Sequence, residues 1–114
     1  MKELKKGKNV IFRGNVKIGK NTVIEDNVIL GSREDGTVEI GENSIVRAGT
    51  VIYSGVKTGN NLKTGHNVLI RENTSVGDNV LVGTNSVIDG DCKIGSNVNI
   101  QTGAYVTRYT TIGD

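Results

Sequence analysis

The 114-residue chain has no proline and only four aromatic side chains, three tyrosines and one phenylalanine. A compact two-layer domain of this length normally uses more aromatic rings to fill its core. The single cysteine, Cys92, cannot form an intramolecular disulfide, so nothing in the chain requires an oxidising compartment. We therefore expect a thin core lined by small branched side chains.

Charge and hydropathy exclude further classes of protein. The formal net charge is only +2, from 14 Lys and Arg against 12 Asp and Glu, which does not indicate a nucleic-acid partner. No apolar run approaches the roughly 20 residues of a membrane span, and the start of the chain has no apolar signal segment. These features predict one domain over residues 1–114 in a soluble, cytoplasmic protein with no membrane partner.

Aliphatic residues or threonine recur at every sixth position. From Ile40 the step gives Ile40, Val46, Ile52, Thr58, Thr64, Ile70, Val76, Val82, Ile88, Ile94, Ile100, Val106 and Ile112. Upstream the same step gives Phe12, Ile18, Ile24 and Leu30. The phase then jumps by ten, which predicts a short loop near residues 32–36.

Three residues after each of these positions comes Asn, Gly or Asp, with few exceptions. Of fifteen such positions between Asn15 and Tyr109, ten are Asn and three are Gly. These residues adopt positive φ at least cost, so a left-handed corner is expected every six residues. If three six-residue faces close a triangle, residue i lies beneath residue i+18 at the strand spacing of about 4.8 Å. The chain is then an all-β, parallel β-helix.

The segments VKIGKN, VEIGEN, TSVGDN, VLVGTN and CKIGSN resemble the repeat of the hexapeptide acyltransferases, and the resemblance covers residues 10–114. It implies a left-handed parallel β-helix of about five to six triangular coils, where a coil is one full turn of three faces. It also implies acetyl-coenzyme A or another acyl-coenzyme A as cosubstrate, with no tightly bound cofactor. Family members form homotrimers whose active sites lie between subunits.

The outward side chains differ among the three faces. On the first face they are polar or charged: Lys17, Glu39, Lys57, Ser75, Lys93 and Thr111. On the third they are all apolar or aromatic: Ile11, Ile29, Val51, Leu69, Val87 and Tyr105. The preference of strands for β-branched residues would make every outward column apolar, and the first column is not. The third column, called here the apolar stripe, therefore predicts an interface, and the resemblance implies that this is the interface of a homotrimer.

His66, the only histidine, lies at the corner that leads into the third face. By resemblance it is the general base that deprotonates an amino or hydroxyl acceptor, a role suited to an imidazole. The alternative is a solvated corner histidine. Thr58 and Thr64 replace aliphatic residues in the same coil, and their hydroxyls are expected to bond backbone carbonyls.

The resemblance also indicates where the donor would lie. Asn67, Thr84, Asn85, Thr102 and Gly103, at or above His66, are the candidates for binding substrate and coenzyme A. The phosphates of a nucleotide or of coenzyme A are expected to meet Arg47 and Arg71. The alternative is that these two are ordinary surface arginines. The predicted function is coenzyme A-dependent acyl transfer, most simply of an acetyl group, to an amino or hydroxyl group of a sugar nucleotide.

Three other functions fit parts of the pattern less well. A zinc carbonic anhydrase of this fold needs three different histidine positions, so no metal site is predicted. A shortened or scaffolding module is the main alternative, because the sequence stops at TTIGD with no apparent cap, and solenoid ends normally need one. Ice binding would need an outward threonine array, which is missing from the outward columns.

Overall fold

A computed structural model describes residues 4–114, which form eighteen short strands in three six-stranded sheets. Sheet A contains β1 (Lys5–Lys6), β4 (Val23–Ile24), β7 (Ile45–Val46), β10 (Lys63–Thr64), β13 (Leu81–Val82) and β16 (Asn99–Ile100). Sheet B contains β2 (Ile11–Phe12), β5 (Ile29–Leu30), β8 (Val51–Ile52), β11 (Leu69–Ile70), β14 (Val87–Ile88) and β17 (Tyr105–Val106). Sheet C contains β3 (Asn15–Ile18), β6 (Thr37–Ile40), β9 (Lys57–Thr58), β12 (Ser75–Val76), β15 (Lys93–Ile94) and β18 (Thr111–Ile112).

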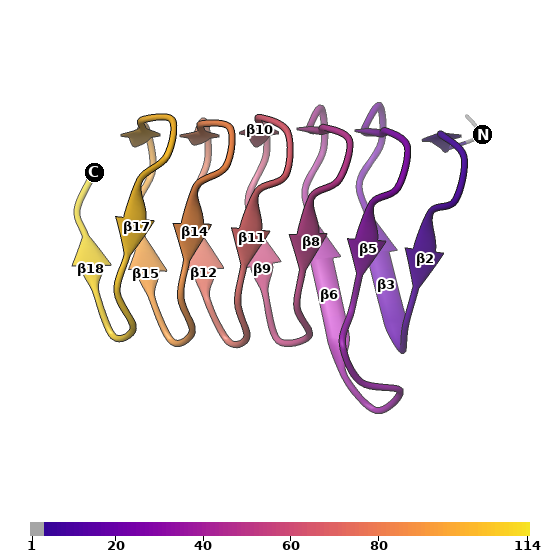
Figure 1. The fold of residues 1–114 in the computed structure, drawn as a ribbon, viewed down its shortest axis with the longest axis horizontal. Helices are drawn as coiled ribbons and strands as arrows, with labels where there is room; N and C mark the ends of the chain where they lie inside the picture. The colour runs from indigo at the N-terminus through magenta and orange to yellow at the C-terminus, as the bar shows by residue number, and fades with distance from the viewer. Residues whose placement is uncertain (1–3) are drawn as a thin grey trace.

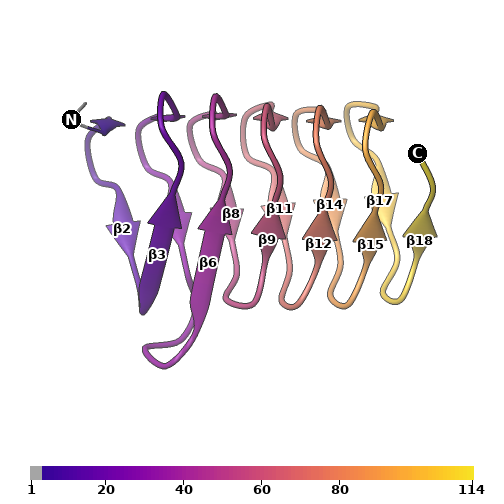
Figure 2. The same cartoon turned by 180° about the vertical axis from the view of Figure 1, so that it is seen from behind.

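The chain winds through the three sheets in turn as a left-handed parallel β-helix of about six coils, with its ends at opposite ends of the solenoid (Figure 1). Figure 2 shows the molecule from behind, with sheet C in front and its strands stacked in the same way. All pairings are parallel; Leu69, for example, pairs with Val51 on one side and Val87 on the other. These registers confirm the predicted fold class, and they stack the residues of the six-residue pattern into three columns, one in each sheet.

Buried aliphatic side chains fill the interior and form the thin core that the composition predicted. Ile24, Leu30, Ile52, Ile70 and Ile88 are at most 1% exposed. Phe12, which the sequence pattern places inward, is instead 40% exposed, because among residues 4–114 its strand β2 pairs with β5 alone and lies at the end of sheet B. The pattern also missed β1, whose two lysines carry no apolar signal.

Small hydroxyl side chains tie successive coils together from inside. The Oγ1 of Thr74 accepts the backbone N–H of Cys92, one coil further on, and donates to the carbonyl of Asp89. Ser86 makes the same pair of bonds, to Ala104 and Gln101. Because buried backbone and hydroxyl groups need partners, Thr74 and Ser86, which directly follow corner residues, serve for hydrogen bonding as well as for filling a small space.

Left-handed residues form the corners, as predicted, at all but one of the fifteen expected positions. The exception is Asn15, which begins the longer strand β3; the corner falls at Gly14, with φ of 74°. A side chain at Gly14 would collide with the carbonyls of Arg33 and Gly36. The loop above therefore forces the corner onto the residue that has no Cβ.

The predicted insertion is present as a loop between β5 and β6 that projects from one corner (Figure 1). Ser54, buried beneath it, fixes its base. The Ser54 hydroxyl accepts the backbone N–H groups of Ser32 and Arg33 at 2.8 and 3.1 Å, and the Ser32 hydroxyl accepts the N–H of Ser54 at 3.1 Å. The start of the loop is thus held in one place relative to sheet B.

Candidate active site

His66 lies on the turn between β10 and β11, where sheet A leads into sheet B, and its side chain is exposed. Its backbone is fixed on the side of the next coil. The His66 N–H donates to Thr84 Oγ1 at 3.1 Å, and its carbonyl accepts the N–H of Asn85 at 2.9 Å. Within residues 4–114 no hydrogen bond holds the imidazole itself, so the ring is available to a ligand.

The candidate substrate residues follow the same corner in two adjacent columns, which together are called here the A–B corner. Thr84 and Thr102 stand one and two coils above His66. The N–H of Gly103, the residue after Thr102, donates to the carbonyl of Thr84 at 2.9 Å. Asn67, Asn85 and Gly103 occupy the left-handed positions, with φ of 56°, 63° and 74°. The latter three therefore have a structural role in forming the corner.

A shallow groove of about 290 Å³ runs along sheet A beside the A–B corner. Thr84 and Thr102 line it together with Gly65 and Gly83. A Cβ at Gly65 would come within 2.5 Å of the Thr84 backbone N, so glycine is required for the coils to stack here. The lack of side chains at these positions keeps the groove open next to His66.

The two candidate phosphate ligands already have acidic partners. Arg47 pairs with Glu25 at 2.7 Å at the edge of the groove, and Lys63 lines the same groove. Arg71 lies on sheet B, pairs with neighbouring Glu72 at 3.0 Å and stacks over the ring of Tyr53 at 4.7 Å. The structure therefore places Arg47 in the lining of the groove beside the A–B corner and Arg71 on a different face.

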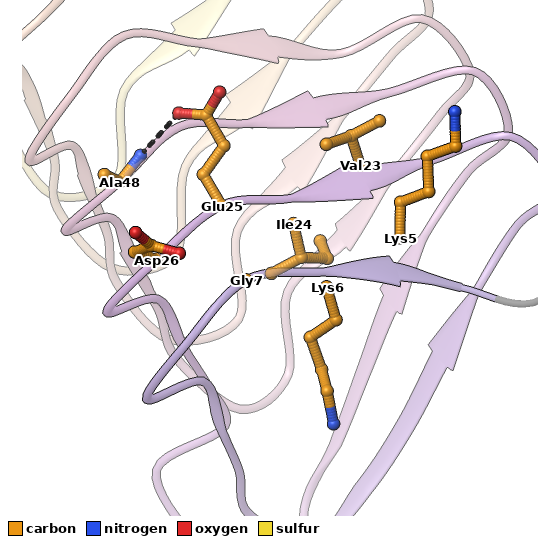
Figure 3. A pocket seen from close by; sticks show the side chains of 8 residues that line it. All are labelled: Lys5, Lys6, Gly7, Val23, Ile24, Glu25, Asp26 and Ala48. Carbon is orange, nitrogen blue, oxygen red and sulfur yellow. Dashed lines mark hydrogen bonds between the residues drawn. The ribbon is translucent and has the colours of Figure 1, made fainter.

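A second hollow, of about 400 Å³, opens at the first coils (Figure 3). Lys5, Lys6, Val23 and Ile24 line it, together with Glu25, whose carboxylate accepts the N–H of Ala48 at 3.1 Å. The two lysine side chains point in opposite directions in Figure 3. Because its cations do not converge, this hollow is a weaker candidate for an anionic ligand than the groove at His66.

The apolar stripe is continuous over the outward side of sheet B. Its six members are in register from Ile11 to Tyr105, which are 42% and 61% exposed, and the four between them are half-buried. The A–B corner with His66 borders one edge of this surface. The opposite edge, where sheet B leads into sheet C, is called here the B–C corner and carries Glu72 and Asn73.

A charged network at the B–C corner was missed by the sequence analysis. The Tyr105 hydroxyl donates to Asp89 Oδ2 at 2.7 Å, and Arg108 holds Asp91 through two nitrogens. The Tyr105 hydrogen bond, followed by the N–H of Gly90, lowers the pKa of Asp89. The sequence did contain a sign of this network. Tyr53, Arg71 and Asp89 directly follow inward residues of one face, at a position where the other faces often carry glycine.

Within the described part of the chain, no group of three or more His, Cys, Asp or Glu side chains could hold a metal ion. Nor do residues 4–114 contain a helix long and apolar enough to cross a membrane.

Two family models match the sequence. The bacterial transferase hexapeptide model (six repeats) matches residues 55–90 and 73–108, and the hexapeptide repeat of succinyl-transferase matches residues 15–54. Comparison with curated proteins finds no match in sequence.

The fold is similar to that of solved acetyltransferases. One is a histidine-to-asparagine mutant of perosamine N-acetyltransferase from Caulobacter crescentus in complex with CoA and GDP-perosamine, with a TM-score of 0.81 and 18% identity, over 95% of this chain and 50% of that one. A histidine-to-alanine mutant of GDP-perosamine N-acetyl transferase from the same organism gives a TM-score of 0.47 and 17% identity, over 96% and 51% of the two chains. The chain thus spans about half the length of these proteins. With the repeat models matching from residue 15 to residue 108, the chain belongs to the hexapeptide-repeat transferase family.

Proposed function

We propose that this protein transfers an acetyl group from acetyl-coenzyme A to an amino or hydroxyl group on a sugar nucleotide, with His66 as the general base. The observation that carries the proposal is the exposed imidazole at the A–B corner, between an open groove and the apolar stripe. Membership of the transferase family supports the reaction class. The CoA and GDP-perosamine held by the structurally similar perosamine N-acetyltransferase motivate the choice of donor and acceptor.

The reaction needs little from the protein beyond placement and one proton acceptor. An acceptor amine reaches His66 as its free base, or an acceptor hydroxyl as the neutral alcohol. As its nitrogen or oxygen attacks the thioester carbonyl, the imidazole takes the proton from the attacking atom. The new C–N or C–O bond then replaces the C–S bond, and the coenzyme A thiolate leaves and takes up a proton. The groove lined by Thr84 and Thr102 is the proposed path for the pantetheine chain.

We further propose that the active unit is a trimer in which the apolar stripe is buried. A chain this small covers little surface on its own, and a continuous outward apolar column is costly in water. Burying the stripe would place the A–B corner at the rim of the interface. His66 would then face a cleft between two copies, away from bulk solvent.

Calorimetric titration of acetyl-coenzyme A, combined with an assay for released thiol, tests this proposal. The acceptor panel contains GDP-perosamine, and the variants are His66→Ala and, as the control, Lys57→Ala on the exposed face of sheet C. We expect acetyl-coenzyme A to bind all three proteins. Turnover should fall by about 10²- to 10⁴-fold only in His66→Ala, the usual contribution of a general base.

Absence of acetyl-coenzyme A binding by the folded protein would refute the proposed acyltransferase function and would favour the alternative of a scaffolding module. Equal turnover by His66→Ala and Lys57→Ala would refute only the role given to His66.

A further inference from the structure

The loop and the B–C corner enclose a hollow that has no role in the function proposed so far. It measures about 270 Å³ and is lined by Ser32, Arg33, Tyr53, Glu72 and Asn73. It lies across sheet B from His66, on the far side of the apolar stripe. Its walls come from three successive coils, so its shape depends on the β-helix as a whole.

The walls combine one aromatic ring with a dense set of polar groups. Tyr53 supplies a flat apolar surface, Glu72 accepts hydrogen bonds, and Arg33 donates them. The ion pair of Arg33 with Asp35 is 3.8 Å long, and both side chains are largely exposed, so it does little to restrain the guanidinium. This mixture suits a sugar ring, which has an apolar C–H face and a rim of hydroxyl groups.

Glu72 is charged at neutral pH and is already oriented. Its own backbone N–H, and then Arg71, lower the pKa of the Glu72 carboxyl group, while desolvation opposes them. Arg71 holds one carboxylate oxygen at 3.0 Å and also stacks on Tyr53, so the aromatic ring and the carboxylate are fixed relative to each other. A carboxylate has about four lone-pair sites. It can therefore still accept hydrogen bonds from a sugar hydroxyl or amino group.

The hollow is preformed at the base of its loop and is small. Ser54 holds the backbone of Ser32 and Arg33, so these groups do not need to be ordered on binding. Pockets for drug-sized ligands usually measure about 300–1,000 Å³. A volume of about 270 Å³ lies below that range and fits one ring. The nucleotide part of a sugar nucleotide would have to lie outside.

The threefold symmetry of the proposed trimer would bring this hollow to His66 of another copy. If sheet B faces the axis of a trimer, the A–B corner of each copy meets the B–C corner of the next, because cyclic interfaces join two different surfaces. A rotation does not change height along the axis. His66 and Glu72 lie six residues apart in one coil, at opposite edges of sheet B. In such a trimer, His66 of one copy would therefore face Glu72 and Asn73 of its neighbour.

From this geometry we infer that the hollow lined by Tyr53, Glu72 and Asn73 binds the amino-sugar ring of the acceptor and presents it to His66 of the adjacent copy. The inference rests on the proposed function and adds to it the subsite that recognises the acceptor. Glu72 is a positioning residue that accepts hydrogen bonds from the hydroxyl groups or the neutral amino group of the acceptor ring.

Titration of D-glucosamine into ¹⁵N-labelled protein, followed by NMR, tests the subsite without any need for turnover. We expect the largest amide shifts at Tyr53, Glu72 and Asn73. Affinity should be about tenfold weaker in Tyr53→Ala and in Glu72→Gln, through loss of an aromatic or a charge-assisted contact. Glu39→Gln on sheet C is the matched control and should bind like the unmodified protein. Because Glu72→Gln conserves size, it keeps the test valid if Tyr53→Ala does not fold.

Shifts elsewhere, or equal binding by Glu72→Gln and Glu39→Gln, would overturn the inference. A parallel titration with acetyl-coenzyme A separates the two proposals, because donor binding with no shift at the hollow refutes the subsite alone. Mixing His66→Ala and Glu72→Gln chains provides a second test. If the site is shared between copies, about one quarter of the sites in random trimers combine an intact His66 with an intact Glu72. A site contained within one chain would regain no activity on mixing.

Discussion

The backbone N–H of His66 donates a hydrogen bond to the side-chain oxygen of Thr84, 3.1 Å away and one coil further along the solenoid. The same bond occurs at the corner between sheets C and A, where the N–H of Asp78 donates to Ser96 Oγ at 2.9 Å. Two equivalent hydrogen bonds, one beside the candidate base and one far from it, allow local stability and catalytic positioning to be measured separately.

Thr84→Val and Ser96→Ala should lower the free energy of unfolding to a similar small extent, about 0.5–1.5 kcal/mol, the net value of one hydrogen bond. Urea unfolding measures this cost. Acetyl transfer should fall several-fold in Thr84→Val only, because the turn that carries His66 loses its anchor. Equal activity in both variants would show that the anchor does not position His66.

Two inward threonines in one coil should respond in opposite ways to replacement by valine. Thr58 Oγ1 is buried without a hydrogen-bond partner within the described residues, whereas Thr64 Oγ1 accepts the backbone N–H of Arg47 at 2.9 Å. Leaving a buried polar group unsatisfied costs about 1–3 kcal/mol. Thr58→Val should therefore stabilise the protein by about 1 kcal/mol and Thr64→Val destabilise it by a similar amount. Thermal unfolding of both variants under identical conditions decides the sign, and a fall in melting temperature for Thr58→Val would contradict the assignment.

Leu69→Glu should dissociate the proposed trimer, because it places a charge in the middle of the apolar stripe. Burying an unpaired carboxylate at an interface costs several kcal/mol. Ser75→Glu is the control, since Ser75 occupies the equivalent outward position on sheet C and is exposed. Light scattering coupled to size exclusion gives the mass of each assembly. A Leu69→Glu protein with the same mass as Ser75→Glu would place the interface elsewhere.

The Tyr105–Asp89 contact should stabilise the last coils only within a limited pH window. The Tyr105 hydroxyl, then the Gly90 N–H, lowers the pKa of Asp89, so this contribution is present above the unfolded pKa and is lost as the pH falls through the folded value. Asp89 in turn raises the pKa of Tyr105, so at alkaline pH the contribution is lost as the pH rises through the folded pKa of Tyr105. In Tyr105→Phe, carboxyl NMR should show the pKa of Asp89 moving back up towards its ordinary value. No change in that pKa would show that the hydrogen bond does not form in solution.

The six-residue period predicted the sheets and their register because each inward residue of the repeat occupies the same environment. It did not predict the charged network, since Glu72 reaches Arg71 and Arg108 reaches Asp91 through flexible outward side chains that no period constrains. It also placed one corner at Asn15, because the steric effect of the loop on Gly14 comes from the neighbouring coil. Of the candidate site, the sequence located His66 and its corner, whereas the hollow at Tyr53 depends on contacts among three coils.

The 18-residue spacing of the coil-to-coil hydrogen bonds also limits how the chain can change in length. Deleting or adding one residue within a face would reverse the inward and outward directions of every side chain up to the next corner. Duplicating or removing a complete coil would leave each remaining side chain over an equivalent neighbour, and extra residues at a corner would extend into solvent, as those of the loop between β5 and β6 do. Such a solenoid can therefore lengthen or shorten by whole coils, with its corner edges changing length in proportion.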